Sequence, residues 1–397
     1  MPVNIRALPE KLALPLPPPK KRWCLVVLLC SMIIAGLVFI LWPDNRWRMT
    51  LWFWCCVLVL PLMGGVTLYT LRLLKFERRS EFVESWNQNR KELEQALIKH
   101  GQRPIALLGT SYCSGAGNNL LAQALRNGSK PLCPTFLKSQ GRALRLSQLS
   151  PPAQLHDKAE YAQRLSAYFD QVMMGLEPEL QLYASDKPLR VRIRHNQVLC
   201  DDEVLALWRS SIGERYAVDQ VVFANQDDGL LWIDALLDEP AASGLLLSLE
   251  VNLFLDPIAE QAESVSTVLL AAPDWCARKG FAPSALIHRP VQIIDQADAL
   301  KDALLWGQIE KGATQYFAWY SQMPSDLLCD TTIALNAEGY PPDIEARLTL
   351  DDSFGRPGCA VGNIALIVAS EGAKADRRAQ MIMLQDASPQ VCVVQPA

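Results

Sequence analysis

The sequence is poor in the residue types from which metal centres and acid–base sites are built. Its 397 residues include only four histidines, and its eleven cysteines are dispersed, with no Cys-x-x-Cys pair and no Cys/His spacing typical of zinc ligands. The formal net charge is −4, and no basic tract lies outside the flanks of two apolar runs. We therefore expect no metal, no cofactor, no disulfide framework and no nucleic-acid partner.

Charged residues are also missing from two long stretches near the start. Trp23–Trp42 and Met49–Leu71 contain no Lys, Arg, Asp, Glu or His. A helix of about 20 residues crosses a hydrocarbon core of roughly 30 Å, and the backbone inside lipid must satisfy its own hydrogen bonds. The residues around the loop 43–48 include four aromatic side chains that favour the headgroup region, Trp42, Trp47, Trp52 and Trp54. Residues 23–71 are therefore predicted to form a transmembrane helical hairpin that contacts the lipid bilayer.

Cations flank this hairpin on one side. Those before and after it are Lys20, Lys21, Arg22, Arg72, Lys75, Arg78 and Arg79, whereas the loop holds only Arg46 and Arg48 beside Asp44. The positive-inside rule predicts a two-pass protein of the bacterial inner membrane, with both termini and the soluble domain in the cytoplasm. Dispersed, unpaired cysteines suit that reducing compartment. The alternative, a cleaved signal peptide, fits badly because a second span follows immediately.

The segments next to the hairpin differ in composition. Residues 1–22 carry the run Pro17-Pro18-Pro19 and are predicted to be a flexible cytoplasmic tail. A docking peptide for a proline-reading partner is the alternative. Residues 72–102 are charged with helical spacing of their apolar positions, and are predicted to form a juxtamembrane helix that ends at Gly101.

From residue 103 onward, strand-like and helix-like segments alternate in two blocks, 103–260 and 261–397. This alternation predicts an α/β layered domain with two pseudo-repeat halves. The expected strands are 103–108, 179–183, 189–193, 220–224, 244–249, 265–271, 284–288, 329–335, 344–350, 381–385 and 392–394. The expected helices are 118–127, 160–175, 201–212, 229–237, 275–279, 298–309 and 359–370. Residues 109–117 are expected to form a turn and residues 129–158 a loop, with Asn118 or Asn119 as the cap of the first helix.

Three motifs carry a resemblance to a known family. The first motif follows a strand and consists of Gly109, Cys113 or Ser114, Gly117, Ala124-Leu125 and Gly128. The second is a predicted strand–helix–strand unit from Val268 to Ile287 that contains Gly280. The third is a glycine-rich turn before a small-residue helix, Ser353–Gly362. Together they resemble the β-ketoacyl synthases, which have the thiolase-like fold. The resemblance covers residues 103–397.

The same resemblance implies that the catalytic groups are missing. A condensing enzyme needs a cysteine at a strand-to-helix elbow, but the matching stretch Val221–Leu231 contains no Cys or Ser and places Asp227 and Asp228 at the helix start. Arg356 stands where the resemblance places the second active-site His, and no His lies near residues 330–336. We therefore expect a catalytically silent relative with no catalytic residue. An active enzyme remains the alternative, with Cys113, Cys200 or Cys359 as reactive thiols.

The remaining candidates favour structural roles. The loop Tyr112–Gly117 has neither dinucleotide-binding nor P-loop spacing, which favours a structural turn. His288 is expected to be a hydrogen-bonded structural residue rather than a catalytic one. His156 and His195 are expected to be solvated. Asp351 and Asp352 are expected to form a surface turn rather than a divalent-cation site. Trp275, Trp306 and Trp319 are expected to be core residues rather than a docking surface.

A paired-helix anchor with a silent α/β body indicates a scaffold or adaptor. The overall plan resembles the accessory proteins of bacterial type VI secretion, which implies protein partners in the secretion apparatus or among its effectors. Thiolase-like domains commonly pair through an extended sheet, so the resemblance also implies a possible homodimer. Two alternatives remain open: a membrane-tethered acyltransferase or condensing enzyme that uses acyl thioesters, and an immunity or inhibitor protein.

Overall fold

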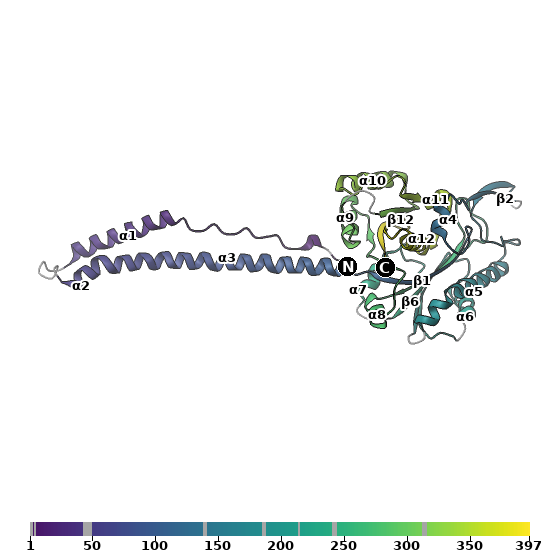
Figure 1. The fold of residues 1–397 in the computed structure, drawn as a ribbon, viewed down its shortest axis with the longest axis horizontal. Coiled ribbons are helices and arrows are strands. Elements are labelled where there is room, and N and C mark those ends of the chain that lie inside the picture. The colour runs from purple at the N-terminus through teal and green to yellow at the C-terminus, as the bar shows by residue number, and fades with distance from the viewer. Residues whose placement is uncertain are drawn as a thin grey trace. The chain divides into compact units, whose positions relative to one another are not determined.

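The structure, a computed structural model, describes residues 3, 5–42, 50–137, 141–184, 188–212, 215–239, 244–311 and 316–397. It contains two compact units, one of residues 4–97 and a larger one that holds residues 98–397 (Figure 1). Each unit is described by itself below.

The smaller unit is built from two long helical segments. Helix α1 (Lys20–Leu41) is followed by a second stretch made of α2 (Leu51–Trp54), the π-helix η3 (Cys55–Val59) and α3 (Leu60–Gly101). Both segments are long and apolar enough to cross a membrane by length and composition. The predicted loop at residues 43–48 lies outside the described residues. The helix predicted at residues 72–102 is not a separate element but the continuation of α3.

Part of the tail predicted at residues 1–22 lies along α3. Residues 8–19, here called the strap, run extended alongside α3 (Figure 1). The Asn87 amide nitrogen donates to the Leu12 carbonyl at 2.9 Å, and the Leu12 N–H donates to the Asn87 amide oxygen at 3.0 Å. Arg90 Nε donates to the Pro9 carbonyl at 2.6 Å. Prolines favour an extended backbone without internal hydrogen bonds, which leaves the strap's carbonyls free for these side chains.

The larger unit contains one long sheet whose two halves repeat the same strand order. The first half consists of β1 (Ile105–Ser114), β4 (Leu189–His195), β5 (Val218–Phe223), β6 (Leu245–Asn252) and β7 (Ser264–Ala271). The second half consists of β8 (Ala285–Ile287), β10 (Tyr316–Ser321), β11 (Arg347–Thr349), β12 (Ala379–Gln385) and β13 (Pro389–Pro396). The sheet order is β11-β10-β12-β13-β8-β1-β7-β6-β4-β5. Counted along the chain, each half therefore has the order 3-2-4-5-1.

In both halves the fifth strand is antiparallel to its neighbours: β7 to β6 and β1, and β13 to β12 and β8. The predicted duplication is thus visible in the topology. The strand repeat divides between Ala271 and Ala285, however, and not at residues 260/261, because β7 completes the first half.

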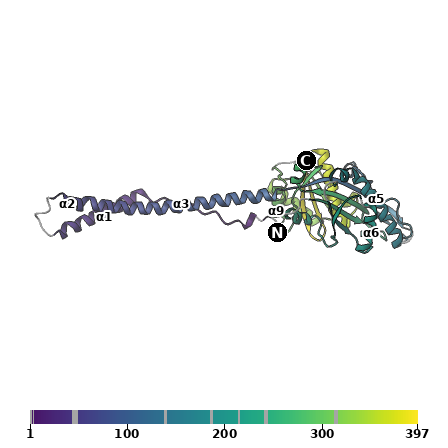
Figure 2. The same cartoon turned by 90° about the horizontal axis from the view of Figure 1, so that it is seen from below.

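The two halves of the sheet both contribute to a core around central helices, and other helices cover their outer faces. Outer helices α5 (Lys158–Tyr183), α6 (Asp201–Ile212) and α8 (Pro273–Lys279) cover the first half, and α9 (Gln296–Trp306) and α10 (Ser325–Glu338) cover the second. Helices α4 (Leu121–Arg126), α7 (Leu231–Asp238) and α12 (Val361–Asp376) form the central layer. In both views α5 and α6 lie together, away from α9 (Figure 1 and Figure 2).

Strand β1 shows why the layers form. Its residues alternate between two cores: Ile105 and Leu107 pack in the cluster of α12, and Ala106 and Leu108 pack in the cluster of α5. A strand covered on both faces reads as a continuous apolar run, as the sequence does here. The mixed α/β layered fold is therefore confirmed.

Several predicted elements are wrong. The strand predicted at 179–183 is the end of α5, where Leu176, Leu180 and Tyr183 continue the helix's buried stripe. The strand predicted at 329–335 lies within α10. The turn predicted at 109–117 is mostly β1, and the loop predicted at 129–158 contains the hairpin of β2 (Cys133–Leu137) and β3 (Arg142–Leu146), a separate two-stranded sheet.

The cap predicted for the helix at 118–127 is also wrong. Helix α4 begins only at Leu121, and neither asparagine caps it. The Leu121 N–H donates to the Tyr112 hydroxyl at 2.8 Å, and the Ala122 N–H donates to a Glu371 carboxylate oxygen at 2.8 Å. These two backbone N–H groups in the first turn of α4 are thus hydrogen-bonded by side chains of β1 and α12.

Candidate functional site

The candidate site lies where the two halves meet, at the elbow of residues 224–230 between β5 and α7. Strand β5 is the third strand of its half and is followed by α7. In the second half the third strand, β11, is followed by the short helices α11 (Leu350–Ser353) and η4 (Gly358–Ala360) and then by α12. The starts of α7 and α12 approach closely: a methyl group on Gly362 would lie 3.1 Å from the Gly229 carbonyl oxygen. The duplicated topology therefore brings two helix N-termini to one place.

The elbow carries two carboxylates, and both are engaged. Asp227 accepts a hydrogen bond from Arg192 Nε at 2.8 Å. Asp228 accepts hydrogen bonds from Gln390 Nε2 at 2.7 Å and from the Ala387 N–H at 3.0 Å. The Gly229 N–H at the start of α7 donates to Asp386 at 2.9 Å. The elbow is thus tied to β4 and to the turn between β12 and β13, and no thiol or hydroxyl stands in it.

Three arginines of β4 form a ladder along this region. The period of two in a strand places Arg190, Arg192 and Arg194 on one face, while the opposite face packs against α5 and α6. Arg190 pairs with Glu239 at 2.8 Å, and Arg194 pairs with Asp386 at 2.6 Å. Arg192 pairs with both Asp227 at 2.8 Å and Glu250 at 2.9 Å. We call these residues the arginine ladder.

Glu250 links the ladder to the second half. It is fully buried; one carboxylate oxygen accepts from Arg192, and the other accepts from the Asn363 N–H at 2.7 Å, near the start of α12. The Asn363 amide in turn donates to the Ser248 carbonyl at 3.1 Å. The carboxylate thus satisfies one of the orphan N–H groups of α12 while it neutralises a buried guanidinium.

The charges of this cluster stabilise one another in their ionised forms. Burial by itself lowers the pKa of the Arg194 guanidinium, but the carboxylates of Glu250 and Asp386 outweigh burial, so the pKa lies above its ordinary value. A guanidinium that is always charged positions other groups but does not exchange protons near neutral pH. The arrangement is that of a structural ion-pair network.

The structure places the three candidate thiols in different surroundings. Cys113 is buried in β1 against the α5 core, and burial raises its pKa to about 12. Cys200 is exposed just before α6. Cys359 precedes α12 and donates to the Val251 carbonyl at 3.0 Å; burial raises its pKa to about 12. A thiol with so high a pKa is a poor nucleophile at neutral pH.

The glycine-rich turn before α12 is arranged differently from the expectation. Arg356, which stands at the implied histidine position, is exposed, and its backbone pairs with Glu260 and Ala262. Cys359 instead lies beside the ion-pair network, with its thiol 3.5 Å from the Asn252 amide oxygen. The residue of this turn that lies close to the charged groups of Arg194 and Glu250 is therefore a cysteine.

Two histidines have surroundings that bear on the predictions. His288 is buried, which lowers its pKa to about 4 and keeps the ring neutral. The prediction of a solvated His195 is wrong: the ring is buried at 3% exposure, with Nε2 at 2.8 Å from Asp201 and Nδ1 accepting from the Gln197 N–H at 3.1 Å. Both ring nitrogens of His195 are thus occupied.

The other predicted candidates have mainly structural roles. Asp351 and Asp352 lie in a short helix at Leu350–Ser353 and not in the predicted surface turn; Asp351 is half-buried and accepts from the Gln322 N–H at 2.8 Å, and burial raises its pKa. Within the described part of the chain, no group of three His, Cys, Asp or Glu residues could hold a metal ion. Trp275, Trp306 and Trp319 are all buried, which confirms the core interpretation. His156 is half-buried, with Nδ1 at 3.0 Å from the Leu255 carbonyl oxygen.

Comparisons with known proteins identify the fold. Neither the protein-family models nor the curated protein sequences give a match. Among solved structures, the ketosynthase from module 1 of the bacillaene synthase from Bacillus amyloliquefaciens is similar, with a TM-score of 0.52 and 10% identity over 75% of this chain and 77% of that chain. The ishigamide ketosynthase/chain length factor gives a TM-score of 0.51 and 12% identity over 74% of this chain and 99% of that one. The chain therefore has the thiolase-like fold of the ketosynthases.

Proposed function

We propose that this protein is a membrane-anchored, catalytically inactive member of the thiolase-like fold that acts as a scaffold or adaptor. The observation that carries the proposal is the elbow between β5 and α7. Where a condensing enzyme needs a nucleophile, this chain has Asp227 and Asp228, and both bind neighbouring strands and turns through hydrogen bonds. Carboxylates engaged in this way serve the fold, and the elbow at residues 224–230 offers no thiol or hydroxyl that could accept an acyl chain.

The anchor in this proposal is the helical hairpin. Its two helices are long and apolar enough to cross a membrane, and seven cations flank the same end of the hairpin. This excess of positive charge at one end of the hairpin predicts a two-pass inner-membrane protein with both termini and the thiolase-like domain in the cytoplasm. The domain would then be concentrated at the bilayer surface, where an adaptor for a membrane apparatus is needed.

The proposed partners are proteins. The overall plan supports a role as an accessory protein of a secretion system of the type VI class, which binds the apparatus or an effector. A second copy of the chain is a further proposed partner: β5 and β11 end the sheet, and Val222 of β5 is 44% exposed. A sheet edge with exposed apolar residues can pair with another edge.

Covalent labelling tests the inactive assignment. The full chain, purified in detergent, is incubated with an acyl thioester, and the intact mass and the modified peptide are measured. We expect no site-specific acylation, with the variants Cys113→Ser, Cys200→Ser and Cys359→Ser behaving like the parent. Acylation of one thiol that its serine variant abolishes would establish the alternative, a membrane-tethered acyltransferase or condensing enzyme.

Cross-linking from intact membranes tests the adaptor role. Cells that express the full chain are cross-linked, the membranes are solubilised, and the protein is recovered through a tag. We expect a defined secretion-apparatus or effector protein in stoichiometric amount, and its loss when the hairpin is deleted. Recovery of the chain alone, with and without cross-linking, would contradict the adaptor role.

A further inference from the structure

One stripe of α3 is apolar over its first part and cationic over its second. Residues three or four apart on a helix share a face. The stripe consists of Leu62, Val66, Tyr69, Arg72, Phe76, Arg79 and Val83. Its apolar part lines a groove against α1, and its cationic part lines a pocket against the strap. This stripe of α3 therefore lines an apolar groove along its first part and a positively charged pocket along its second part.

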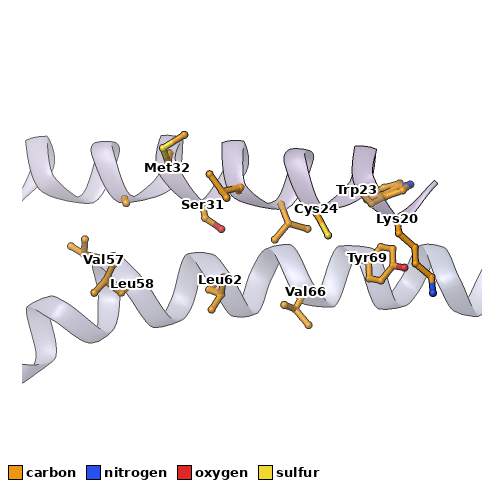
Figure 3. A pocket seen from close by; sticks show the side chains of 13 residues that line it. Lys20, Trp23, Cys24, Ser31, Met32, Val57, Leu58, Leu62, Val66 and Tyr69 are labelled. Carbon is orange, nitrogen blue, oxygen red and sulfur yellow. The ribbon is translucent and has the colours of Figure 1, made fainter. Parts of the chain in front are cut away.

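The groove between α1 and α3 has a volume of about 600 Å³. Figure 3 shows apolar side chains from both helices along it, with Lys20 at one end, reaching toward α3 beside Tyr69. The rings of Trp23 and Tyr69 lie 6.1 Å apart at this end. Amphipathic aromatic rings favour the level of the lipid headgroups, which places the ammonium of Lys20 at that level.

The pocket between α3 and the strap has a volume of about 560 Å³ and is lined by Arg72, Lys75 and Arg79. These three side chains are exposed, and they form no ion pair with any residue that the structure describes. Apolar side chains, among them Phe76 and Leu16, line the same pocket. Unpaired cations beside apolar surface favour a ligand that is both anionic and apolar.

The residues that line the two cavities are neighbours along the chain. Pro18 of the strap lines the pocket and Lys20 of α1 lines the groove, two residues further along the chain. On α3, Tyr69 of the groove and Arg72 of the pocket lie one turn apart. A single ligand with a long chain and an anionic head can therefore occupy both.

We propose that the hairpin binds one anionic phospholipid, with its phosphate among Lys20, Arg72 and Lys75 and one acyl chain in the groove between α1 and α3. This inference rests on the proposed membrane hairpin. A free phosphate would leave the apolar groove unused. A zwitterionic lipid carries its own cation, which the three basic side chains would repel.

Photo-cross-linking in a bilayer tests the site. The full chain is placed in phosphatidylcholine nanodiscs that contain a trace of phosphatidylglycerol with a photoreactive acyl chain, and the labelled peptides are mapped by mass spectrometry. We expect labels on groove residues such as Val27 and Val66, and displacement by unlabelled phosphatidylglycerol but not by added phosphatidylcholine. Labels spread evenly over the outer faces of both helices would overturn the proposal.

Matched variants separate a site from general charge attraction. In K20Q/R72Q both changes remove cations that line the two cavities; in K21Q/R78Q they remove neighbouring cations that line neither. The bulk of this bilayer is zwitterionic, so only cations next to the bound anionic headgroup should count; at about fivefold in affinity for each, K20Q/R72Q should lose about 25-fold in groove labelling. K21Q/R78Q should change it little. Equal loss in both variants would overturn the site.

Two further readouts separate the possible failures. Inorganic phosphate that displaces the labelled lipid as well as phosphatidylglycerol does would show a free-anion site and overturn the lipid assignment. Alkaline extraction of the membranes tests the anchor itself. A protein that is released by alkali contradicts the proposed hairpin, whereas a protein that stays in the membrane but shows no groove labelling contradicts the lipid site alone.

Discussion

Replacing Glu250 by Gln should destabilise the thiolase-like domain although the shape of the side chain is kept. Glu250 is fully buried, and its carboxylate pairs with Arg192 at 2.9 Å. Gln keeps one oxygen that can accept the Asn363 N–H, but its amide NH2 then faces the Arg192 guanidinium, so the substitution removes the charge and one accepted hydrogen bond. Of the two carboxylates that pair with the Arg192 guanidinium, Asp227 then remains.

The expected loss follows from the cost of a broken buried pair. Removing one partner of such a pair costs about 3–5 kcal/mol. Because Asp227 still faces Arg192 at 2.8 Å, we expect the low end, about 3 kcal/mol. Unfolding entropy is about 2.1 cal/mol/K per residue, or about 0.6 kcal/mol/K for a unit of roughly 300 residues, so Tm should fall by about 5 °C.

The control is a second ion pair of the same ladder. Arg190 and Glu239 also lie 2.8 Å apart, but their side chains are 34% and 44% exposed. Exposed pairs contribute little, so Glu239→Gln should cost less than about 0.5 kcal/mol and lower Tm by less than about 1 °C. Thermal unfolding of the full chain in detergent, followed by near-UV circular dichroism, measures both variants.

Equal shifts for the two variants would refute the reasoning. A fall of under about 2 °C in Glu250→Gln would mean that water or backbone movement compensates Arg192, and that the network does not hold the two halves together. A fall of about 5 °C in Glu239→Gln would mean that the loss of any ladder charge matters, whatever its burial.

Three further outcomes are expected. Asn87→Ala removes both hydrogen bonds to the Leu12 backbone and should release the strap, seen as faster amide exchange at residues 8–19, whereas Gln88→Ala should not. At pH 8, iodoacetamide should label exposed Cys200 well before Cys113, because burial raises the Cys113 pKa to about 12 and leaves little thiolate; early labelling of Cys113 would contradict its burial. Val222→Lys should shift any dimer toward monomer in sedimentation, and an unchanged dimer would exclude the β5 edge.

Elements with strong local signals are where the sequence predicts them. Helix α6 has the predicted bounds, Asp201–Ile212, because acidic residues fill its first turn and its apolar positions recur every four residues. Val204, Trp208 and Ile212 are all buried. Strands β4, β6 and β7 likewise follow continuous or alternating apolar runs, and the elbow between β5 and α7 lies at the stretch that the family resemblance indicates.

The partners of the ladder could not be read from the sequence. The alternation of arginines in β4 and the lone Glu250 in an apolar run were visible signals of a polar strand face. The carboxylates that neutralise Arg192 lie 35 and 58 residues away, at places that only the sheet order determines. The alternation of residues in a strand identifies its polar face, but the order of strands in the sheet decides which residues cover that face.

The strand propensity of its residues led to the wrong prediction for α10. Thr331, Thr332 and Ile333 are β-branched and favour strands, yet they lie within a helix. The hydroxyl groups of Thr331 and Thr332 donate to the carbonyls of Leu327 and Leu328, one turn earlier. Packing of Leu335 into the core of α9, β10 and β12 outweighs the intrinsic preference.

The position of β13 has a consequence for the order in which the molecule can be made. This strand, the last of the sheet to be synthesised, lies between β12 and β8 near the middle of the strand order, not at an edge. The ribosome therefore completes both apolar helices and nine strands of that order before the central gap can be filled. During that interval the facing edges of β12 and β8 are unpaired, so the nascent domain depends on protection until its final strand has been translated.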